Sequence, residues 1–398
     1  MRITVITGLT PTPENRKGIS ALLYSLICYR PSDVEVKIYS YNLNTISDDE
    51  ILQISRQLNA EIKVIKMPKW FNLFRRSSWL TRFNKFCMKR PIECYVFPNK
   101  KVLNEIRQDN GDFVLLYPYF MHRLTEKLQD KRFVILSPDS LSLHMARRFR
   151  SPFRINRTKF LIDDSINLVK YKNMEKEWGG NGINILFVGM EDLKFYSILS
   201  GNNNSHFLLH PYTRYKDKII NLKNEKLKVL IAGSYDIYSN TDVDLMLPSL
   251  IKHKKALLER FSFTFLGKKW ESIKEKLNDG GFACEVKTWV DDYIEEIVKY
   301  DIQLTPVCYG TGTKGKTLDG LVNGLLVIGS KYAFENICVR DMDSCVLYRN
   351  AKDVADILIS ISQHREIYQS IAEKGREQIK KYHSPERISN RFFNIYGN

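Results

Sequence analysis

Short apolar segments alternate with amphipathic segments of helical period through the first half of the chain. The amphipathic segments predict helices at Gly18–Tyr29, Asp48–Leu58 and Arg157–Trp178. The apolar segments predict strands at Arg2–Thr7, Val34–Tyr41, Glu61–Met67, Phe113–Phe120, Phe133–Leu136 and Ile183–Val188. This alternation is typical of βαβ units and predicts a mainly parallel sheet.

A second series of the same pattern follows residue 227. It predicts strands at Val229–Gly233, Phe263–Gly267, Cys284–Trp289, Ile302–Tyr309, Leu325–Gly329 and Cys345–Tyr348. Six strands with intervening helices describe a Rossmann-like unit. The segment between the two series is polar and charged, which is typical of a linker. We therefore expect an N-terminal Rossmann-like domain at 1–212, a linker at 213–227, a C-terminal Rossmann-like domain at 228–380 and a last helix within 381–398.

The stretch from Thr305 to Ser330 carries the clearest chemical signal. An apolar strand leads into a turn with Gly310 and Gly312, and Thr313 is expected to cap the helix that follows. The helix start brings backbone N–H groups, the positive end of a helix dipole and two lysines, Lys314 and Lys316, to one place. That combination suits a phosphate or diphosphate, and Asp319 lies within reach of a sugar hydroxyl. The alternative is an ordinary strand-to-helix turn with solvated lysines.

The segment GTGTKGKTLDGLVNGLLVIGS resembles the donor site of family 4 glycosyltransferases. The resemblance implies that Gly312, Thr313, Lys314 and Lys316 hold the diphosphate of the donor. Asp319 stands where the family usually has a glutamate that binds the ribose. Gly315 and Leu326 depart from the usual apolar residue and proline.

Two other segments extend this resemblance. VLIAGSYDIYSN is similar to the opening strand and loop that face the donor, so Gly233 and Ser234 are expected to line its phosphates. TWVDDYIEEI is similar to the segment whose backbone, here near Val290, borders the nucleotide base.

The family resemblance also implies a fold and an activity. The fold is α/β of the GT-B type, with two Rossmann-like domains facing each other across a cleft and a C-terminal helix crossing back to the first domain. The activity is a retaining transfer of a sugar from a nucleoside diphosphate sugar to a saccharide, expected to be lipid-linked, in surface polysaccharide biosynthesis. Neither a metal ion nor a cofactor is expected, since fixed positive groups take the place of a divalent ion.

Candidate residues in the first half are fewer. Lys17 and Gly18 match the family's first loop, which approaches donor or acceptor. Asp139 follows the predicted strand Phe133–Leu136 at the edge where this fold places chemistry. It could orient or deprotonate an acceptor hydroxyl. Alternatively, it is only a helix N-cap or part of an Asx turn.

The segment Lys66–Arg90 is basic and aromatic, with no acidic residue. We expect it to dock on an anionic membrane surface, because basic and aromatic side chains at helical spacing suit that environment. The alternative is a helix that buries its aromatic residues in the core. The residues expected to form this membrane patch are Trp70, Phe71, Phe74, Arg75, Arg76, Trp79, Arg82 and Lys85.

Composition narrows the choice of partners and location. The chain has 61 Lys+Arg against 45 Asp+Glu, a net charge of +16, which favours anionic partners. No nucleic-acid-binding signature accompanies the charge, so nucleic acid is not expected. The seven cysteines form no CxxC pair, which favours a reducing compartment and argues against zinc. With no export signal and no long apolar run, we expect a cytoplasmic protein, peripheral on the inner face of the plasma membrane.

Two other functions fit parts of the sequence. A nucleotide-sugar epimerase on the GT-B scaffold would use the same donor site and need no acceptor. A noncatalytic protein that binds anionic polymers or nucleic acid would use the positive charge without the ordered glycine and lysine turn.

Overall fold

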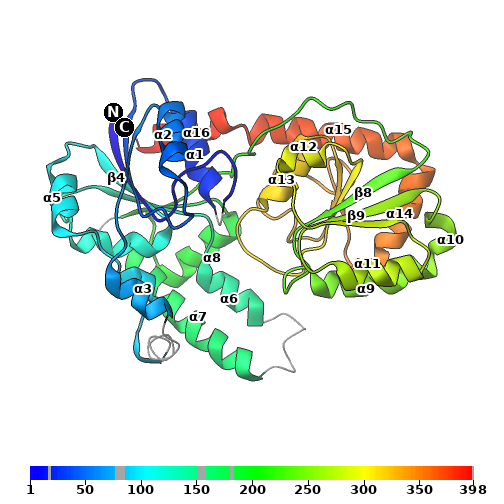
Figure 1. Ribbon diagram of the computed structural model, residues 1–398, viewed down its shortest axis with the longest axis horizontal. Helices are drawn as coiled ribbons and strands as arrows, with labels where there is room; N and C mark the ends of the chain where they lie inside the picture. Colours follow the sequence, from blue (N-terminus) through cyan, green and yellow to red (C-terminus); the bar gives the residue numbers. More distant parts are fainter. Residues whose placement is uncertain (17–18, 77–85, 150–157, 180–182, 397–398) are drawn as a thin grey trace. The chain divides into compact units, whose positions relative to one another are not determined.

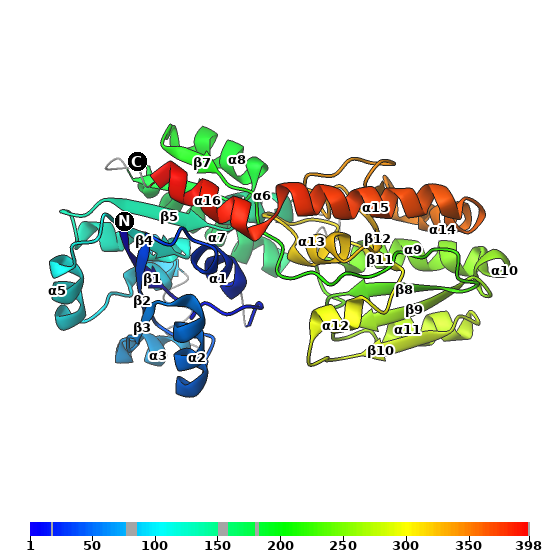
Figure 2. The same ribbon diagram turned by 90° about the horizontal axis from the view of Figure 1, so that it is seen from above.

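The computed structural model describes residues 1–16, 19–76, 86–149, 158–179 and 183–396. The chain divides into two compact units (Figures 1 and 2), the first made of Met1–Thr213 with Pro385–Asn398 and the second of Arg214–Ser384. Two parallel sheets were expected from the sequence, and each unit contains one. No helix among the described residues is both long enough and apolar enough to cross a membrane.

The first unit is built on a seven-stranded sheet in the order β3-β2-β1-β4-β5-β6-β7, with every neighbouring pair parallel. Its strands are β1 Arg2–Thr7, β2 Glu35–Ser40, β3 Glu61–Val64, β4 Phe113–Tyr117, β5 Phe133–Ser137, β6 Asn184–Phe187 and β7 Ser205–Phe207. Its helices are α1 Ser20–Cys28, α2 Asp48–Leu58, α3 Lys69–Arg76, α5 Lys100–Gln108, α6 Leu141–Phe149, α7 Thr158–Trp178, α8 Met190–Ser200 and α16 Pro385–Tyr396, with 3-10 turns η1 Ile92–Tyr95 and η2 Tyr119–Glu126.

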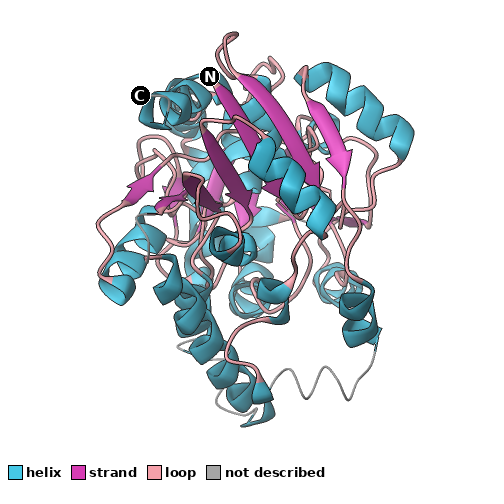
Figure 3. Cartoon of the chain, turned by 90° about the vertical axis from the view of Figure 1, so that its left-hand side faces the viewer, coloured by secondary structure: helices cyan, strands magenta, loops and turns pink. Residues whose placement is uncertain are grey.

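Both faces of this sheet are covered by helices (Figure 3), so its strands are apolar on both sides. Successive residues of β1 divide between the faces: Val5 packs with α1, α2 and α16, whereas Ile6 packs with α5, α7 and α8. The helix α16 is part of this core, because Phe392 lies 6.4 Å from Phe113 between ring centroids and is almost fully buried. The last helix of the chain therefore belongs to the first unit.

The second unit has a six-stranded parallel sheet in the order β10-β9-β8-β11-β12-β13. Its strands are β8 Leu227–Ala232, β9 Phe261–Leu266, β10 Cys284–Lys287, β11 Ile302–Thr305, β12 Leu326–Gly329 and β13 Val346–Leu347. Its helices are α9 Asn240–Lys252, α10 Lys254–Leu257, α11 Glu271–Asp279, α12 Tyr293–Ile297, α13 Gly315–Val322, α14 Val354–Gln363 and α15 Arg365–Tyr382, with a 3-10 turn η5 Ala351–Asp353.

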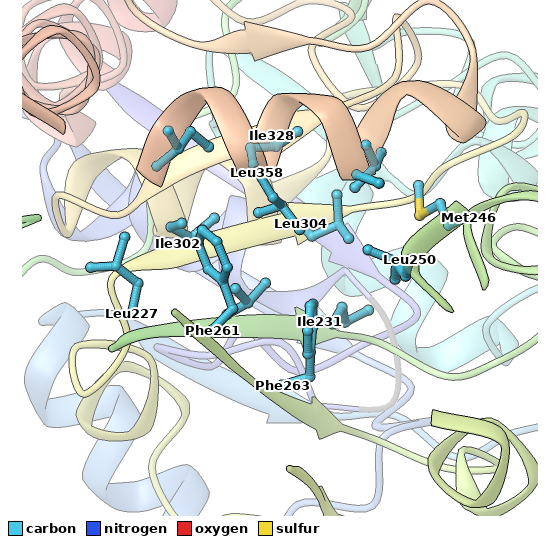
Figure 4. Close-up of a cluster of buried hydrophobic side chains, with 14 of the residues drawn as sticks. Leu227, Ile231, Met246, Leu250, Phe261, Phe263, Ile302, Leu304, Ile328 and Leu358 are labelled. Atoms are coloured by element: carbon cyan, nitrogen blue, oxygen red, sulfur yellow. The ribbon is translucent and has the colours of Figure 1, made fainter. Parts of the chain in front are cut away.

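The main core of the second unit lies on one face of its sheet (Figure 4). Side chains of β8, β9, β11 and β12 meet those of α9 and α14 there, as Ile231, Phe263 and Leu358 illustrate. A smaller cluster on the other face joins Leu230 with Ile294 and Ile297 of α12. The strand order changes direction between β8 and β11, and ligands of such sheets bind where the strands on either side of that point end.

Two of the expected strands are shorter in the structure, and the expected linker packs against one unit. The strands expected at Phe113–Phe120 and Ile302–Tyr309 end at Tyr117 and Thr305, because Pro118 and Pro306 cannot donate a ladder hydrogen bond. The segment expected to be a linker is docked on the second unit. Residue Asn323 at the end of α13 accepts a hydrogen bond from the Lys216 N–H at 2.8 Å and donates one to the Arg214 carbonyl.

Candidate functional site

The loop between β11 and α13 forms the centre of the candidate site. It leaves the sheet at Pro306 and turns at Gly312, whose φ of 63° is a left-handed conformation that favours glycine. The helix α13 begins at Gly315 and its N-cap is Lys314, with no side-chain capping bond. The expected cap at Thr313 is therefore wrong by one residue. The first N–H groups of such a helix have no acceptor within the helix, so they form a site suited to anions.

Lys314 folds back over this loop. Its ammonium donates hydrogen bonds to the carbonyl oxygens of Thr311 at 2.7 Å and of Gly312 at 3.3 Å. A Cβ atom added to Gly310 would lie 3.2 Å from both Cε and Nζ of Lys314, so the glycine makes room for the lysine. Lys314 thus stabilises the curved loop and also places a positive charge inside it.

Lys316 lies among groups from three different segments. Its ammonium is 5.5 Å from the centroid of the Tyr293 ring, at the start of α12. The carboxylates of Asp319, on α13, and Asp236, after β8, are close enough to raise the pKa of Lys316. Desolvation is the larger effect, and it lowers that pKa below its usual value. The side chain nevertheless keeps part of its surface in contact with solvent, since Lys316 as a whole residue is exposed.

Asp319 is the acid expected to bind a ribose. It is buried, and its charge adds to the burial of Tyr293, which is the main reason that the pKa of Tyr293 lies well above the usual range. The carboxylate of Asp319, the ammonium of Lys316 and the ring of Tyr293 therefore form one cluster. The sequence analysis identified the lysine and the acid; it missed Tyr293 and Asp236, because neither follows a glycine-rich pattern and both lie far from the lysines along the chain.

Gly233 and Ser234 follow β8, at the point where the strand order changes direction. Gly233 has a φ of 136°, and its carbonyl accepts a hydrogen bond from the Trp270 indole N–H at 2.7 Å. A Cβ atom added to Gly267 would lie only 2.0 Å from the Gly233 carbonyl oxygen. The two strand ends therefore need glycine at both positions, and they hold the loop that carries Asp236.

Val290 lies in the loop between β10 and α12. It packs, half-buried, against the small apolar cluster that also anchors Tyr293. Asp292 caps α12 by accepting a hydrogen bond from the Glu295 N–H at 2.9 Å, and Arg214 donates to the same carboxylate at 2.6 Å. These contacts fix the start of α12, so the position of the Tyr293 ring is set by the docked segment as well as by the core.

In the first unit, the structure excludes one of the two roles considered for Asp139, that of a helix N-cap. The N-cap of α6 is Ser140, whose hydroxyl oxygen accepts a hydrogen bond from the Leu143 N–H at 3.2 Å. Asp139 contributes its carbonyl, which accepts from the Ser137 hydroxyl at 2.7 Å. Its carboxylate is therefore not the cap of this helix.

A buried carboxylate beside α6 was missed by the sequence analysis. Glu175, on α7, is fully buried and accepts hydrogen bonds from the hydroxyls of Ser140 and Ser142. Burial raises the pKa of Glu175 to about 7, and the hydrogen bonds from Ser142 and Ser140 act against that rise. In sequence it is one of several charged residues of a long helix, so only the packing distinguishes it.

The first loop is described in part, since Lys17 and Gly18 lie outside the described residues. Its described portion contains a buried neutral network. The Thr10 N–H donates to the side-chain oxygen of Asn44 at 2.9 Å, and the Asn44 amide donates to the Thr10 carbonyl at 2.9 Å. The hydroxyls of Thr10 and Ser40 are also 2.9 Å apart.

The predicted membrane patch is only partly described. Trp79, Arg82 and Lys85 lie outside the described residues, while Phe74, Arg75 and Arg76 belong to α3. Phe71 is only 3% exposed and packs in the core of the first unit, so it has to be removed from the patch. Trp70 is 37% exposed, and the neighbouring Leu73 and Phe86 are 61% and 66% exposed.

No group of histidine, cysteine, aspartate or glutamate side chains suited to a metal ion is found among the described residues. Two aspartates in the first turns of α9, Asp242 and Asp244, accept hydrogen bonds from tyrosine hydroxyls. Tyr348 donates to Asp242 at 2.5 Å, and Tyr235 donates to Asp244 at 2.6 Å. This pair therefore stabilises the packing of α9.

Comparison with known structures bears out the predicted GT-B fold. HepE from Anabaena in complex with UDP is 10% identical, with 100% of both chains covered and a TM-score of 0.64. WaaG, a glycosyltransferase involved in lipopolysaccharide biosynthesis, is 12% identical, with 99% of this chain and 100% of that chain covered and a TM-score of 0.63. Sucrose-phosphate synthase from Thermosynechococcus elongatus is 8% identical, with 100% and 98% covered and a TM-score of 0.67. At these identities the similarity shows the fold.

Comparison of the sequence with protein families adds to the structural similarity. No curated protein matches this chain. The family model of glycosyl transferase-like proteins, however, matches residues 245–394, which include the loop and helix with Lys314, Lys316 and Asp319. The resemblance of that segment to glycosyltransferases is thereby confirmed. The chain therefore has a GT-B fold, and its residues 245–394 match the model of glycosyl transferase-like proteins.

Proposed function

We propose that the protein transfers a sugar, with retention of configuration, from a nucleoside diphosphate sugar bound to its second unit to a saccharide acceptor. The observation that carries this proposal is the cluster around Lys316 at the carboxyl end of β11. There a helix N-terminus and the charges of Lys314 and Lys316 lie beside the buried carboxylate of Asp319. HepE, which has the same fold, binds UDP, and we take UDP as the first donor nucleotide to test.

The chemistry of sugar transfer explains why these groups are needed. When the bond between the anomeric carbon and the diphosphate breaks, negative charge develops on the departing phosphate oxygens. Fixed positive groups stabilise that charge in the transition state more than in the ground state, and so lower the barrier. In this role Lys316 and the first N–H groups of α13 face the diphosphate, Lys314 keeps the loop in shape, and Asp319 accepts a hydrogen bond from a ribose hydroxyl. No step in this scheme requires a metal ion.

A donor screen tests this proposal. The purified protein is incubated with UDP-, GDP- and ADP-sugars, with and without saccharide acceptors and with EDTA, and the products are analysed by NMR. Transfer that keeps the anomeric configuration and persists in EDTA is the expected result. Formation of an epimer without acceptor would support the epimerase alternative, and the absence of turnover and nucleotide binding would contradict the assignment.

For the acceptor we propose a role for Asp139, supported by its place directly after β5 and by the fact that Ser140, not Asp139, caps α6. A carboxylate there is suited to orient or deprotonate an acceptor hydroxyl. We expect Asp139→Asn to slow transfer while leaving donor affinity and melting temperature unchanged. Normal transfer kinetics combined with a lower melting temperature would identify Asp139 as a structural residue instead.

We further propose that the acceptor is a lipid-linked saccharide of surface polysaccharide biosynthesis and that the segment Lys66–Arg90 holds the enzyme at an anionic membrane. The exposed side chains of Trp70, Leu73 and Phe86 support this, because they add apolar contact area to a basic segment. Each lysine or arginine near anionic lipid contributes on the order of 1 kcal/mol.

Sedimentation with liposomes tests the membrane proposal. The protein should pellet with anionic liposomes at low salt and should be released at 1 M salt, where the Debye length is about 3 Å. A variant with Arg75, Arg76, Arg82 and Lys85 changed to serine should stay in the supernatant. If the wild-type protein does not pellet at low salt, or if it pellets equally with neutral liposomes, the proposal is wrong.

A further inference from the structure

The ring of Tyr293 is the aromatic neighbour of the ammonium that the proposed donor site depends on. The Lys316 ammonium is 5.5 Å from the ring centroid, within the range of a cation–π interaction. Lys316 itself is exposed on a helix start, and a lysine stem has several rotatable bonds. The ring is thus a contact that can hold this ammonium in one place.

The ring is itself firmly placed. Tyr293 is the first residue of α12, directly after the cap Asp292, which Arg214 holds by a hydrogen bond of 2.6 Å. The next residues of α12 bury Ile294 and Ile297 in the small apolar cluster. Because the ring is held by α12, its contact with the Lys316 ammonium restricts the motion of that side chain, although Lys316 belongs to α13.

The hydroxyl of Tyr293 makes no contact within the described part of the chain that would account for a tyrosine at this position. It is buried and makes no hydrogen bond with any of the described residues. An unpartnered buried hydroxyl destabilises a protein, so the useful part of this side chain is the ring. Burial raises the pKa of Tyr293, and the charge of the nearby Asp319 carboxylate raises it further, so the hydroxyl stays protonated.

We propose that Tyr293 is a positioning residue for the donor diphosphate, because its ring keeps the Lys316 ammonium at the start of α13 and directed at the phosphates. This inference rests on the proposed function. Tyr293 acts through Lys316, and the bond that breaks in the transfer is not one that Tyr293 needs to touch. Phenylalanine should replace it without loss, whereas leucine should not.

The geometry can be tested without any donor. Lysines are reductively methylated with ¹³C, and the Lys316 signal is assigned by its absence in Lys316→Arg. The ring current should shift this signal in the wild-type protein and in Tyr293→Phe, and the shift should be lost in Tyr293→Leu. A Lys316 signal that is the same in all three proteins would overturn the proposal, whatever the protein binds.

The consequence for binding is measured by calorimetry with UDP and with uridine. We expect Tyr293→Leu to weaken UDP binding about fivefold, to leave uridine binding unchanged, and to match wild type in melting temperature within a few degrees. Tyr293→Phe should bind both ligands like wild type. Equal losses for leucine and phenylalanine, or equal losses for UDP and uridine, would show that the ring does not act through Lys316.

A matched control comes from the same unit. The ammonium of Lys380, on α15, lies 4.0 Å from the centroid of the Tyr215 ring. Tyr215→Leu should therefore leave the affinity for UDP unchanged. If wild type binds neither UDP nor the GDP and ADP of the donor screen, the proposed function fails and this inference fails with it. The ring-current measurement then still shows whether the ring and the ammonium are in contact.

Discussion

The two parallel sheets differ in the polar groups at the edges where their strand order changes direction. In the first unit, the loop after β1 holds the neutral network of Thr10, Ser40 and Asn44, whose members bond to one another. In the second unit, the loop after β11 holds the charged groups of Lys314 and Lys316, and the carboxylates of Asp236 and Asp319 lie near Lys316. A network of neutral groups that satisfy one another mainly stabilises its unit, whereas a cluster of charges is suited to a ligand that brings the opposite charge.

This difference predicts that variants at the two edges fail in different measurements. Changes at the first edge should lower stability and leave donor binding unchanged. Changes at the second edge should lower donor binding and leave stability nearly unchanged.

The largest effect is expected for Asn44→Ala. The variant removes two hydrogen bonds and leaves the buried N–H and carbonyl of Thr10 without partners, at a cost of about 2–4 kcal/mol. Chemical denaturation should show a less stable first unit, and UDP affinity at low denaturant should equal that of wild type. Asn221→Ala, at an exposed asparagine, is the control and should change neither quantity. A variant that lost UDP affinity at full stability would contradict the division of roles.

The raised pKa of Glu175 predicts that the free energy of unfolding of the first unit depends on pH. Its pKa is about 7 in the folded protein against an ordinary value of 4.5, so the folded state binds its proton more tightly than the unfolded state does. The stabilisation is fully present below pH 4.5 and is lost as the pH rises toward 7, a change of about 3 kcal/mol. Glu175→Gln should remove this part of the pH dependence.

Measurement of unfolding free energies of both proteins between pH 4.5 and 8 provides the test. The difference between wild type and Glu175→Gln should shift in favour of the variant as the pH rises. A difference that stays constant over this range would show that Glu175 is ionised at all of these pH values.

Lys316→Ala should weaken UDP binding ten- to a hundredfold. A charge-assisted hydrogen bond to a phosphate is worth about 1.5–3 kcal/mol, and the melting temperature should hardly change. Lys314→Ala should lower binding and also loosen the loop, because it removes the bonds to Thr311 and Gly312. Lys380→Ala, which removes the same charge elsewhere in the unit, is the control. Full activity of both loop variants would contradict the donor site.

Asp319→Asn should weaken UDP binding less, by about 1–1.5 kcal/mol, since a neutral amide still accepts a hydrogen bond from a ribose hydroxyl. The informative comparison is between UDP and its 2′- and 3′-deoxy analogues. Wild type should prefer UDP, and the preference should shrink in the variant. Equal binding of all three nucleotides by wild type would argue against a ribose role for Asp319.

The smallest effect is expected in the pH dependence of binding. Burial lowers the pKa of Lys316, and the phosphates bind its charged form. The affinity of wild type for UDP should therefore be full below this pKa and decline as the pH rises through it. Lys316→Arg keeps its charge, so its affinity should not decline over the same range. Parallel pH profiles of the two proteins would show that the Lys316 ammonium does not face the phosphates.

Much of the fold could be predicted from the sequence because βα units are local. The alternation of apolar and amphipathic segments indicated every strand of the second sheet, and the errors lie at their ends. Pro306 and Pro118 show the reason: hydrophobicity continues past them, but a proline stops the hydrogen-bond ladder.

The candidate site could be predicted only where its residues are close together in sequence. Lys314, Lys316 and Asp319 lie within two turns of one helix start, so their spacing is visible. Tyr293 reaches Lys316 only because the starts of α12 and α13 come close to each other in the folded unit. Glu175 likewise gains its raised pKa from its burial in the folded unit. Phe71 shows the reverse error, since an aromatic residue in a basic segment was assigned to the surface and is buried.

The two points where the chain passes between the units determine how the second unit can be exchanged between proteins of this fold. The helix α16 supplies Phe392 and Tyr396 to the core of the first unit, so a truncation after residue 213 would remove part of that core. The segment that begins at Arg214 is bound to Asn323 and Asp292, so a foreign unit grafted at residue 228 would lose its own clamp on α12 and α13. A working hybrid should replace 214–384 as a single insert, with both junctions chosen outside these contacts.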